Sequence, residues 1–464
     1  MKRLSYILTA LLCTFLTACD MDIVPKGQST LEKTSDLELL MNVKTIRESP
    51  FTRLGLVVNE SYGGEVSTIA TQISNENTTA AILLTYNESL DLAPLASKDD
   101  VYGDIYQYVH YMTVILSKID GASGEDSRKS AIKAEAKVTR AYYLCLAANI
   151  YAKQYDAATV DGEGGIAYPE TPDIDTKPQL PLKECYEKML DDCSDENIAA
   201  LLDNANANRI TKAGGNAVRA FILFQMKRYD EALAYAEKAI ALNGNIEDRS
   251  SIAETGQWVL LSSAENNLFY ISPFYDEFSS PVWEVLSPET ASLFEKGDYV
   301  KDYAYDGYFA YWDSFYGTYL TGIVGALWAT GYDAYSNPWG LTVEQMMYLA
   351  AECHIRKGNV AQGLDLVNRV RKFRIHPDNY QPLAADNADD AMAQLQRAKF
   401  IECIGSFWNF VDRRRWNTED KYRKTITRDL QASGKYSIAP ESKLWVMPFP
   451  LRVMQNNPTF KQNY

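Results

Sequence analysis

Histidine is the scarcest chemically versatile residue in this chain of 464 residues, occurring only as His110, His354 and His376. These positions lie too far apart to form a local metal-ligand motif, which argues against a metalloenzyme built on histidines. Basic residues are also few: 46 Lys and Arg stand against 61 Asp and Glu, for a formal net charge of −15. A chain this acidic is poorly suited to nucleic acid as a partner.

Long apolar runs are absent beyond the first residues of the chain. After the N-terminal leader, no stretch reaches the roughly 18 uninterrupted apolar residues that are typical of a membrane-spanning helix. The 25 glycines and 17 prolines are too few for a collagen-like or disordered chain. With 46% hydrophobic and 23% charged residues, the composition predicts a globular protein.

Residues 1–18 have the layout of a secretory signal peptide, with two cations, an apolar run and then small residues. The tetrapeptide LTAC, which ends at Cys19, resembles a bacterial lipobox, in which the cysteine is acylated and becomes the new N-terminus. Two acyl chains on Cys19 would hold the protein at a membrane permanently. The alternative is an ordinary signal peptide cleaved elsewhere, with Cys19 lost or free.

The cysteines do not allow a complete disulfide framework. Of the seven in the chain, Cys13 lies in the signal peptide and Cys19 is the lipidation site, which leaves an odd number. Cys185 and Cys193 are separated by more than two helical turns, so a bridge inside one straight helix would not close. We therefore expect buried free thiols at the five remaining positions: Cys145, Cys185, Cys193, Cys353 and Cys403.

Three segments have the pattern of paired helices. Residues 217–242 carry apolar side chains at helical spacing, and their small residues would let two helices approach closely, as in a tetratricopeptide (TPR) motif. Residues 344–372 show the same pattern, with Ala351 and Gly363 at the positions where the two helices would pack closely. Residues 134–158 show it as well, with Ala158 at the corresponding position. Because the spacings far exceed the ~34 residues of a tandem array, the sequence predicts a mostly α, TPR-like scaffold with large insertions.

Two insertions differ in composition from the scaffold. Residues 161–181 are rich in Gly, Pro and Asp and predict a surface loop. The acidic side chains of this loop lack the spacing of an EF-hand, so a solvated loop is favoured over a cation site. Residues 258–339 hold 22 aromatics in 82 positions, and Tyr299–Tyr319 alone holds ten. Most of these rings are expected in the core, and those on loops make this insertion a candidate ligand-binding subdomain.

Several motifs, in order, resemble one family. Glu135, Ala136 and Arg140-Ala141-Tyr142 match an "EAR-x-x-RA-Y-Y" helix, with Lys137 in place of the arginine. The segment 401–416 resembles "E-x-x-x-EG-x-R-W-x-D-L-x-RW", although Phe407 replaces an arginine. Further matches are the "GG-(I/V)" loop at 164–166, the "SK-x-A-A" helix start at 211–220 and the terminal "NP-x-L-x-QN" run at 457–464. On these motifs the chain is identified as a member of the SusD/RagB nutrient-binding lipoproteins of Bacteroidetes.

The resemblance implies a single SusD-like domain over residues 19–464. It further implies an outer-membrane lipoprotein that faces the cell exterior. Asp20 and Asp22 also resemble the surface-export signals of Bacteroidetes lipoproteins. Such proteins deliver a captured oligosaccharide to a SusC-like TonB-dependent transporter. They use no cofactor or metal and catalyse nothing, and the chain has no G-x-S-x-G, H-E-x-x-H or P-loop motif.

Three other functions stay open from sequence alone. A peptide-binding, RagB-like capture protein would use the same scaffold but favour hydrogen bonds to an extended backbone. A TPR assembly-scaffold lipoprotein would have no small ligand, yet the aromatic insertion interrupts the continuous repeats that it needs. A glycosidase with a carboxylate pair has no motif in its favour.

For an oligosaccharide ligand, we expect exposed aromatic rings that stack on sugar faces, supplemented by polar side chains. Loop breaks and aromatic density favour positions in the long insertion, with two more from the N-terminal segment. The expected ligand-binding residues are Tyr62, Asn75, Trp283, Tyr311, Trp312, Tyr316, Tyr319 and Trp328.

Overall fold

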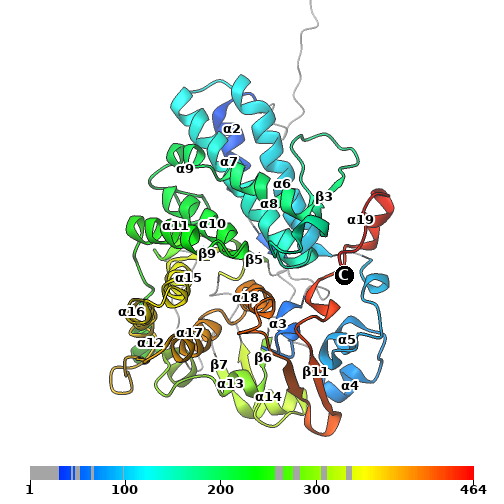
Figure 1. The fold of residues 1–464 in the computed structure, drawn as a ribbon, viewed down its shortest axis with the longest axis vertical. Coiled ribbons are helices and arrows are strands. Elements are labelled where there is room, and N and C mark those ends of the chain that lie inside the picture. Colours follow the sequence, from blue (N-terminus) through cyan, green and yellow to red (C-terminus); the bar gives the residue numbers. More distant parts are fainter. Residues whose placement is uncertain are drawn as a thin grey trace, which may run out of the picture.

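The computed structural model describes residues 31–42, 45–47, 53–63, 67–97, 99–256, 265–274, 283–304, 311–330 and 337–464. Helices dominate these residues, and the strands are short (Figure 1). The mostly α, TPR-like fold expected from the sequence is confirmed. No helix in these ranges is long and apolar enough to cross a membrane.

The N-terminal part combines short elements with two long antiparallel helices, α6 (Asp100–Lys118) and α7 (Asp126–Tyr151). Almost every residue of α7 after its first turns is buried, because α6, α8 and α9 all pack against it. The other elements here are α2 (Thr34–Leu39), β1 (Thr45–Arg47), α3 (Leu54–Val57), α4 (Ile69–Ile73), α5 (Thr79–Thr85), α8 (Leu182–Asp192) and α9 (Asp195–Ala200).

Two helical hairpins lie where the sequence predicts them. Helices α10 (Lys212–Gln225) and α11 (Tyr229–Leu242) form the first, and α15 (Val343–Arg356) and α16 (Val360–Arg371) form the second. A Cβ at Gly363 would lie 2.8 Å from the carbonyl oxygen of Ala351. Glycine is therefore required where α16 crosses α15, as the small-residue pattern indicates.

The segment 134–158 departs from the prediction. It supplies only α7, which ends at Tyr151, and Ala158 lies exposed in a turn rather than at a helix crossing. The hairpin is formed instead with the preceding helix, α6. The next α-helix in the chain, α8, also packs on α7, but only after the loop and strands of residues 152–181.

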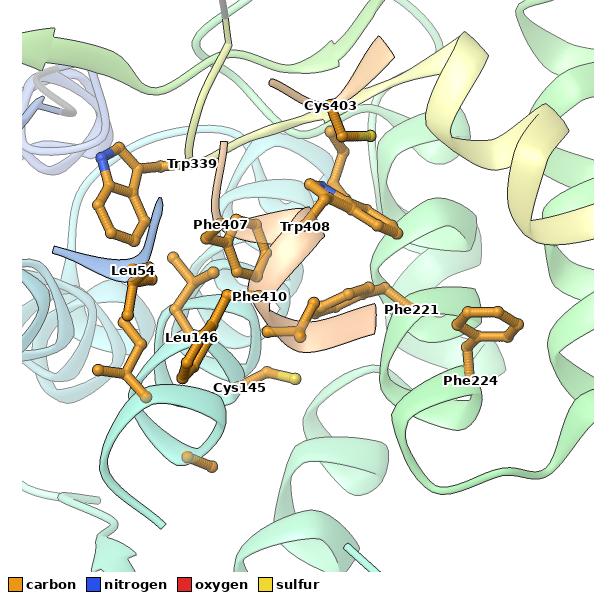
Figure 2. Packing of buried hydrophobic residues seen from close by; sticks show 14 of the residues in the cluster. Leu54, Cys145, Leu146, Phe221, Phe224, Trp339, Cys403, Phe407, Trp408 and Phe410 are labelled. Atoms are coloured by element: carbon orange, nitrogen blue, oxygen red, sulfur yellow. The ribbon is translucent and has the colours of Figure 1, made fainter. Parts of the chain in front are cut away.

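Helix α18 (Phe407–Asn417) runs through the middle of the molecule, and all of its residues are buried. Trp408 contacts Phe221 of α10 with ring centroids 4.7 Å apart, and Phe407 stacks on Trp339 (Figure 2). Helix α17 (Ala388–Glu402) precedes it, and α19 (Leu451–Asn456) lies near the C-terminus. The free cysteines Cys145, Cys185, Cys193, Cys353 and Cys403 are all buried, as expected.

The long insertion forms small sheets with a core of their own. Strand β8 (Leu327–Thr330) lies between β6 (Trp283–Leu286) and β7 (Tyr311–Asp313), antiparallel to both. Leu286, Leu327 and Ala329 of this sheet pack in a cluster separate from the main core. The remaining elements of this region are α12 (Ser251–Thr255), β4 (Asn267–Phe269), β5 (Ser272–Phe274), α13 (Pro288–Ala291), the π-helix at Tyr299–Tyr303, α14 (Ser314–Thr321) and β9 (Leu341–Thr342).

Two hairpins of strands complete the fold. In the segment 161–181, β2 (Gly164–Ala167) pairs with β3 (Gln179–Pro181), and the loop between them is largely exposed. No group of three potential metal ligands occurs among the described residues. Near the C-terminus, β10 (Ile426–Asp429) pairs with β11 (Lys435–Ile438), and this hairpin reaches α14 at the bottom of the view in Figure 1.

Candidate ligand-binding site

Helix α14 carries the candidate binding surface. The carboxylate of Asp313 caps its start by accepting a hydrogen bond from the backbone N–H of Tyr316. Gly322 ends it in the left-handed conformation, with φ of 75°. A Cβ at Gly317 would lie 2.3 Å from the carbonyl oxygen of Ala326, so glycine lets this helix lie directly against the start of β8.

Large hydrophobic side chains on α14 and the turn after it face the solvent. We call them the aromatic patch; they are Phe315 (72% exposed), Tyr316 (47%), Tyr319 (70%) and Val324 (69%). The ring of Tyr316 lies 5.5 Å from the half-buried ring of Trp328, at a tilted angle. The other strongly exposed large hydrophobic side chains in the described ranges lie on separate elements: Leu39, Ile174 and Leu242.

Two distant segments border the aromatic patch. Thr68, at the start of α4, lies next to Gly322, and Asn75 follows α4 as an exposed side chain. On another side, the Gln431 amide accepts a hydrogen bond from the Val324 N–H (3.1 Å) and donates one to the Val324 carbonyl (3.0 Å). The structure thus brings the N-terminal segment, the insertion and the C-terminal hairpin together around α14.

The ligand-binding residues expected from the sequence differ in their exposure to solvent. Tyr316 and Tyr319 present their rings on the surface, whereas Trp312 and Trp328 are half-buried. Trp312 makes an edge-to-face contact with Phe294, at 5.6 Å, and packs on the insertion's own core. The side chains of Trp283 and Tyr311 lie outside the described residues.

Tyr62 requires a correction. Its side chain is fully buried, and burial raises the pKa of its hydroxyl. Its backbone N–H donates to the carbonyl of Val285, so the N-terminal segment crosses the inner side of the insertion at this point. A ring enclosed in this way cannot stack on a ligand, and Tyr62 belongs to the core.

The sequence reasoning missed Phe315, Val324 and Gln431. Phe315 lies in the densest aromatic run, and its spacing of four residues from Tyr319 places both on one side of a helix. That spacing was a usable signal once the Asp313 cap and the Gly322 stop were read as the ends of a helix. Gln431 had no local signal, because only the tertiary fold brings it to Val324.

The fold and part of the sequence match known proteins. Residues 31–223 match the family model SusD-like_3, described as "Starch-binding associating with outer membrane". A SusD superfamily protein from Bacteroides thetaiotaomicron shares the fold at 15% identity, with a TM-score of 0.66 over 93% of this chain and 100% of that one.

Two structures from Bacteroides vulgatus share the fold as well. The first is described as a putative sugar binding protein, at 14% identity and a TM-score of 0.64 over 94% of this chain and 99% of that one. The second is a SusD-like carbohydrate binding protein, at 12% identity and a TM-score of 0.64 over 93% and 98%. The search of curated proteins returned no significant match. Residues 31–223 are therefore similar to the SusD-like family model, and the chain shares its fold with solved SusD-like structures.

Proposed function

We propose that this protein is a cell-surface lipoprotein that captures an oligosaccharide and delivers it to a SusC-like TonB-dependent transporter. The observation that carries the proposal is the aromatic patch, where Phe315, Tyr316 and Tyr319 project from one short helix into solvent. The family description and the sugar-binding relatives support a carbohydrate as the ligand. Like its family, the protein would bind its ligand without cleaving it.

The chemistry of sugars suits such a surface. A pyranose ring has an apolar face of C–H groups that packs on an aromatic ring, while its hydroxyls need polar partners at the edge. Here Tyr316 and Tyr319 supply rings with hydroxyl tips, and Asn75 is an exposed amide in the N-terminal segment, seven residues after Thr68. Because Gly317 seats α14 on the sheet and Gln431 holds the following turn, the rings stand on a fixed platform before a ligand arrives.

A double substitution tests the patch. Phe315→Ala with Tyr319→Ala is expected to weaken oligosaccharide binding about tenfold or more, because each stacked ring contributes about 0.5–1.5 kcal/mol beyond the area that it buries. Affinity would be measured by calorimetry with the tightest binders from a panel of starch, pectin and mucin oligosaccharides. The melting temperature should not change, since both side chains are exposed.

The matched control for this test is Leu242→Ala, which removes an exposed apolar side chain from α11, away from the patch. It should leave affinity unchanged. If the double variant keeps both its melting temperature and full affinity, the patch is not the binding surface. If the panel gives no binder and a peptide library does, the peptide-binding alternative gains the support that the glycan proposal loses.

Anchoring is tested at Cys19, which lies outside the described residues. We expect Cys19→Ala to move the protein from the membrane fraction to a soluble compartment, because the acyl chains that hold it there can no longer be attached. Cell fractionation followed by immunoblotting measures the change, in cells that lack the transporter. Cys13→Ala, within the signal peptide, serves as the control. A Cys19→Ala protein that stays in the outer membrane would refute the lipid anchor.

A further inference from the structure

A cavity with a volume of about 470 Å³ is lined by none of the residues of the aromatic patch. Its walls come from the segment after α3, from α13, α17 and α18, and from the chain that leads into β10. Its volume is within the usual range for small-molecule sites. What distinguishes it is the charge of its lining.

Three cationic side chains line this cavity: Arg413 from α18, Arg397 from α17 and Lys424 before β10. Glu289 is the one carboxylate in the lining. Within the part of the chain that the structure describes, none of the three cations has a carboxylate within ion-pair distance. This positive site belongs to a protein whose net charge is −15.

Of the three cations, Arg413 gives the strongest indication of an anion site because it is buried, with 7% of its surface exposed. Its two neighbours on the same helix have close partners. Arg415 pairs with Glu352, and Arg414 donates to the backbone carbonyls of Asn149 in α7 and of Ala152 just after it. Arg413 makes one long hydrogen bond, from Nη1 to the carbonyl oxygen of Tyr422 at 3.4 Å, and its guanidinium lies over the Trp416 ring. A guanidinium has five N–H donors, so most of those on Arg413 have no partner among the described residues and are available to a ligand.

Two further observations point to a ligand. Gln396, in the same lining, has a buried Nε2 without a hydrogen-bond partner among the described residues. Burial lowers the pKa of Arg413 to about 10. Lys424 is exposed along its side chain, but the partial burial of its ammonium group and the charge of Arg413 lower its pKa to about 8. The protein therefore holds cations close together at an energetic cost that a bound anion would offset.

We propose that this cavity binds the carboxylate or sulfate group of an acidic sugar. The planar fork of Arg413 suits two oxygens of such a group, Trp416 offers an apolar wall, and Gln396 offers a further donor. Arg397 and Lys424, which are exposed, stand at the rim and attract the anion.

The assignment to a sugar rests on the proposed function, whereas the assignment to an anion does not. The two sites share supporting elements. Pro288 of α13 lies beside Gly325 in the turn of the aromatic patch, and the next residue, Glu289, lines the cavity. Strand β10 lines the cavity as well, and the hairpin that it forms holds Val324. One acidic oligosaccharide of sufficient length could contact both.

The test compares three probes by calorimetry at low salt and pH 7: inorganic sulfate, digalacturonate and neutral galactobiose. The structure leads us to expect that digalacturonate binds at least tenfold more tightly than galactobiose. Lys424→Gln should weaken digalacturonate binding about fivefold or more and leave galactobiose unchanged. Lys421→Gln is the control, because Lys421 is an exposed lysine that pairs with Asp389 and does not line the cavity. Arg413→Gln should abolish anion binding. If the Arg413→Gln protein fails to fold because Arg413 is buried, the result for Lys424→Gln alone decides the test.

Each outcome has a defined meaning. Equal binding of the acidic and neutral disaccharides, or full digalacturonate affinity in Lys424→Gln, overturns the proposal. Binding of sulfate without digalacturonate supports an anion site but overturns the sugar assignment. The Phe315→Ala/Tyr319→Ala protein separates this inference from the proposed function. If this protein still binds sulfate, the anion site in the cavity is supported even when the aromatic patch is shown not to bind the oligosaccharide.

Discussion

Replacing Glu352 with glutamine is expected to lower the free energy of unfolding by about 3–5 kcal/mol. Glu352 is fully buried on α15 and accepts hydrogen bonds from Nη1 and Nη2 of Arg415, at 2.6 and 2.8 Å. Trp416 Nε1 and the guanidinium of Arg356 also donate to it. Removal of this charge leaves the buried Arg415 with two counter-ions among the described residues, Asp412 at 3.0 Å and the more distant Glu419 at 3.9 Å.

The stabilisation that Glu352 contributes is expected to depend on pH, because it is lost when the carboxylate is protonated. Burial by itself would raise the pKa of the carboxyl, but Arg415, Arg356 and Lys399 together hold it below its usual value. A lowered folded-state pKa means that the stabilisation is present above about pH 4.5 and is lost as the pH falls. Acid unfolding should therefore be less steep in Glu352→Gln than in the wild-type protein.

Urea denaturation monitored by circular dichroism measures the loss. Glu187→Gln, which changes an exposed acid on α8, serves as the control and should stay within about 0.5 kcal/mol of the wild type. A loss below 1 kcal/mol in Glu352→Gln would show that the buried pair does not hold α15 and α18 together. Replacing Arg415 with methionine in the same protein should recover part of the loss, because the uncompensated charge is then removed.

The second large effect is expected at Glu60, whose carboxylate is buried after α3. It accepts hydrogen bonds from the N–H of Gly405 (2.7 Å) and from Nδ2 of Asn409 (2.6 Å). These bonds do not offset burial, which raises the pKa of Glu60 to about 7. With a folded-state pKa above the unfolded value, the stabilisation is full below about pH 4.5 and declines as the pH rises through 7. A shift of this size corresponds to about 3 kcal/mol.

Glu60→Gln is therefore expected to remove about 3 kcal/mol of the pH dependence of stability between pH 4.5 and 8. The measured quantity is the difference between the unfolding free energies of variant and wild type at each end of this range. For the control variant Glu187→Gln, the difference in unfolding free energy from the wild type should be the same at both ends of the range. A Glu60→Gln protein whose stability changes with pH exactly in parallel with the wild type would show that Glu60 titrates normally in the folded state.

Local patterns explain why the helical hairpins could be found without the structure. At 217–242 and 344–372 the two helices are neighbours in sequence, and small residues such as Gly363 mark the crossing. The same reasoning was wrong at 134–158, since α7 forms its hairpin with the helix before it, α6. A pattern shows that a helix has a face to bury but not which neighbour will cover it.

The aromatic residues show this limit most clearly. Tyr62 and Tyr319 are the same residue type, yet Tyr62 is fully buried and Tyr319 is 70% exposed. Tyr62 is enclosed where the N-terminal segment pairs with the insertion at Val285. No local pattern carries that information, because the pairing joins residues more than 200 positions apart.

The sequence by itself determined the helical class of the fold, the family motifs, the free buried cysteines and the insertion that carries the aromatic patch. Each of these depends on residue spacing or composition over short stretches of chain. The tertiary structure alone decided which rings face solvent, and it alone assembled the cavity of Arg413, Arg397 and Lys424. Burial and electrostatic potential depend on distances in space, and long-range packing sets those distances for residues that are remote in sequence.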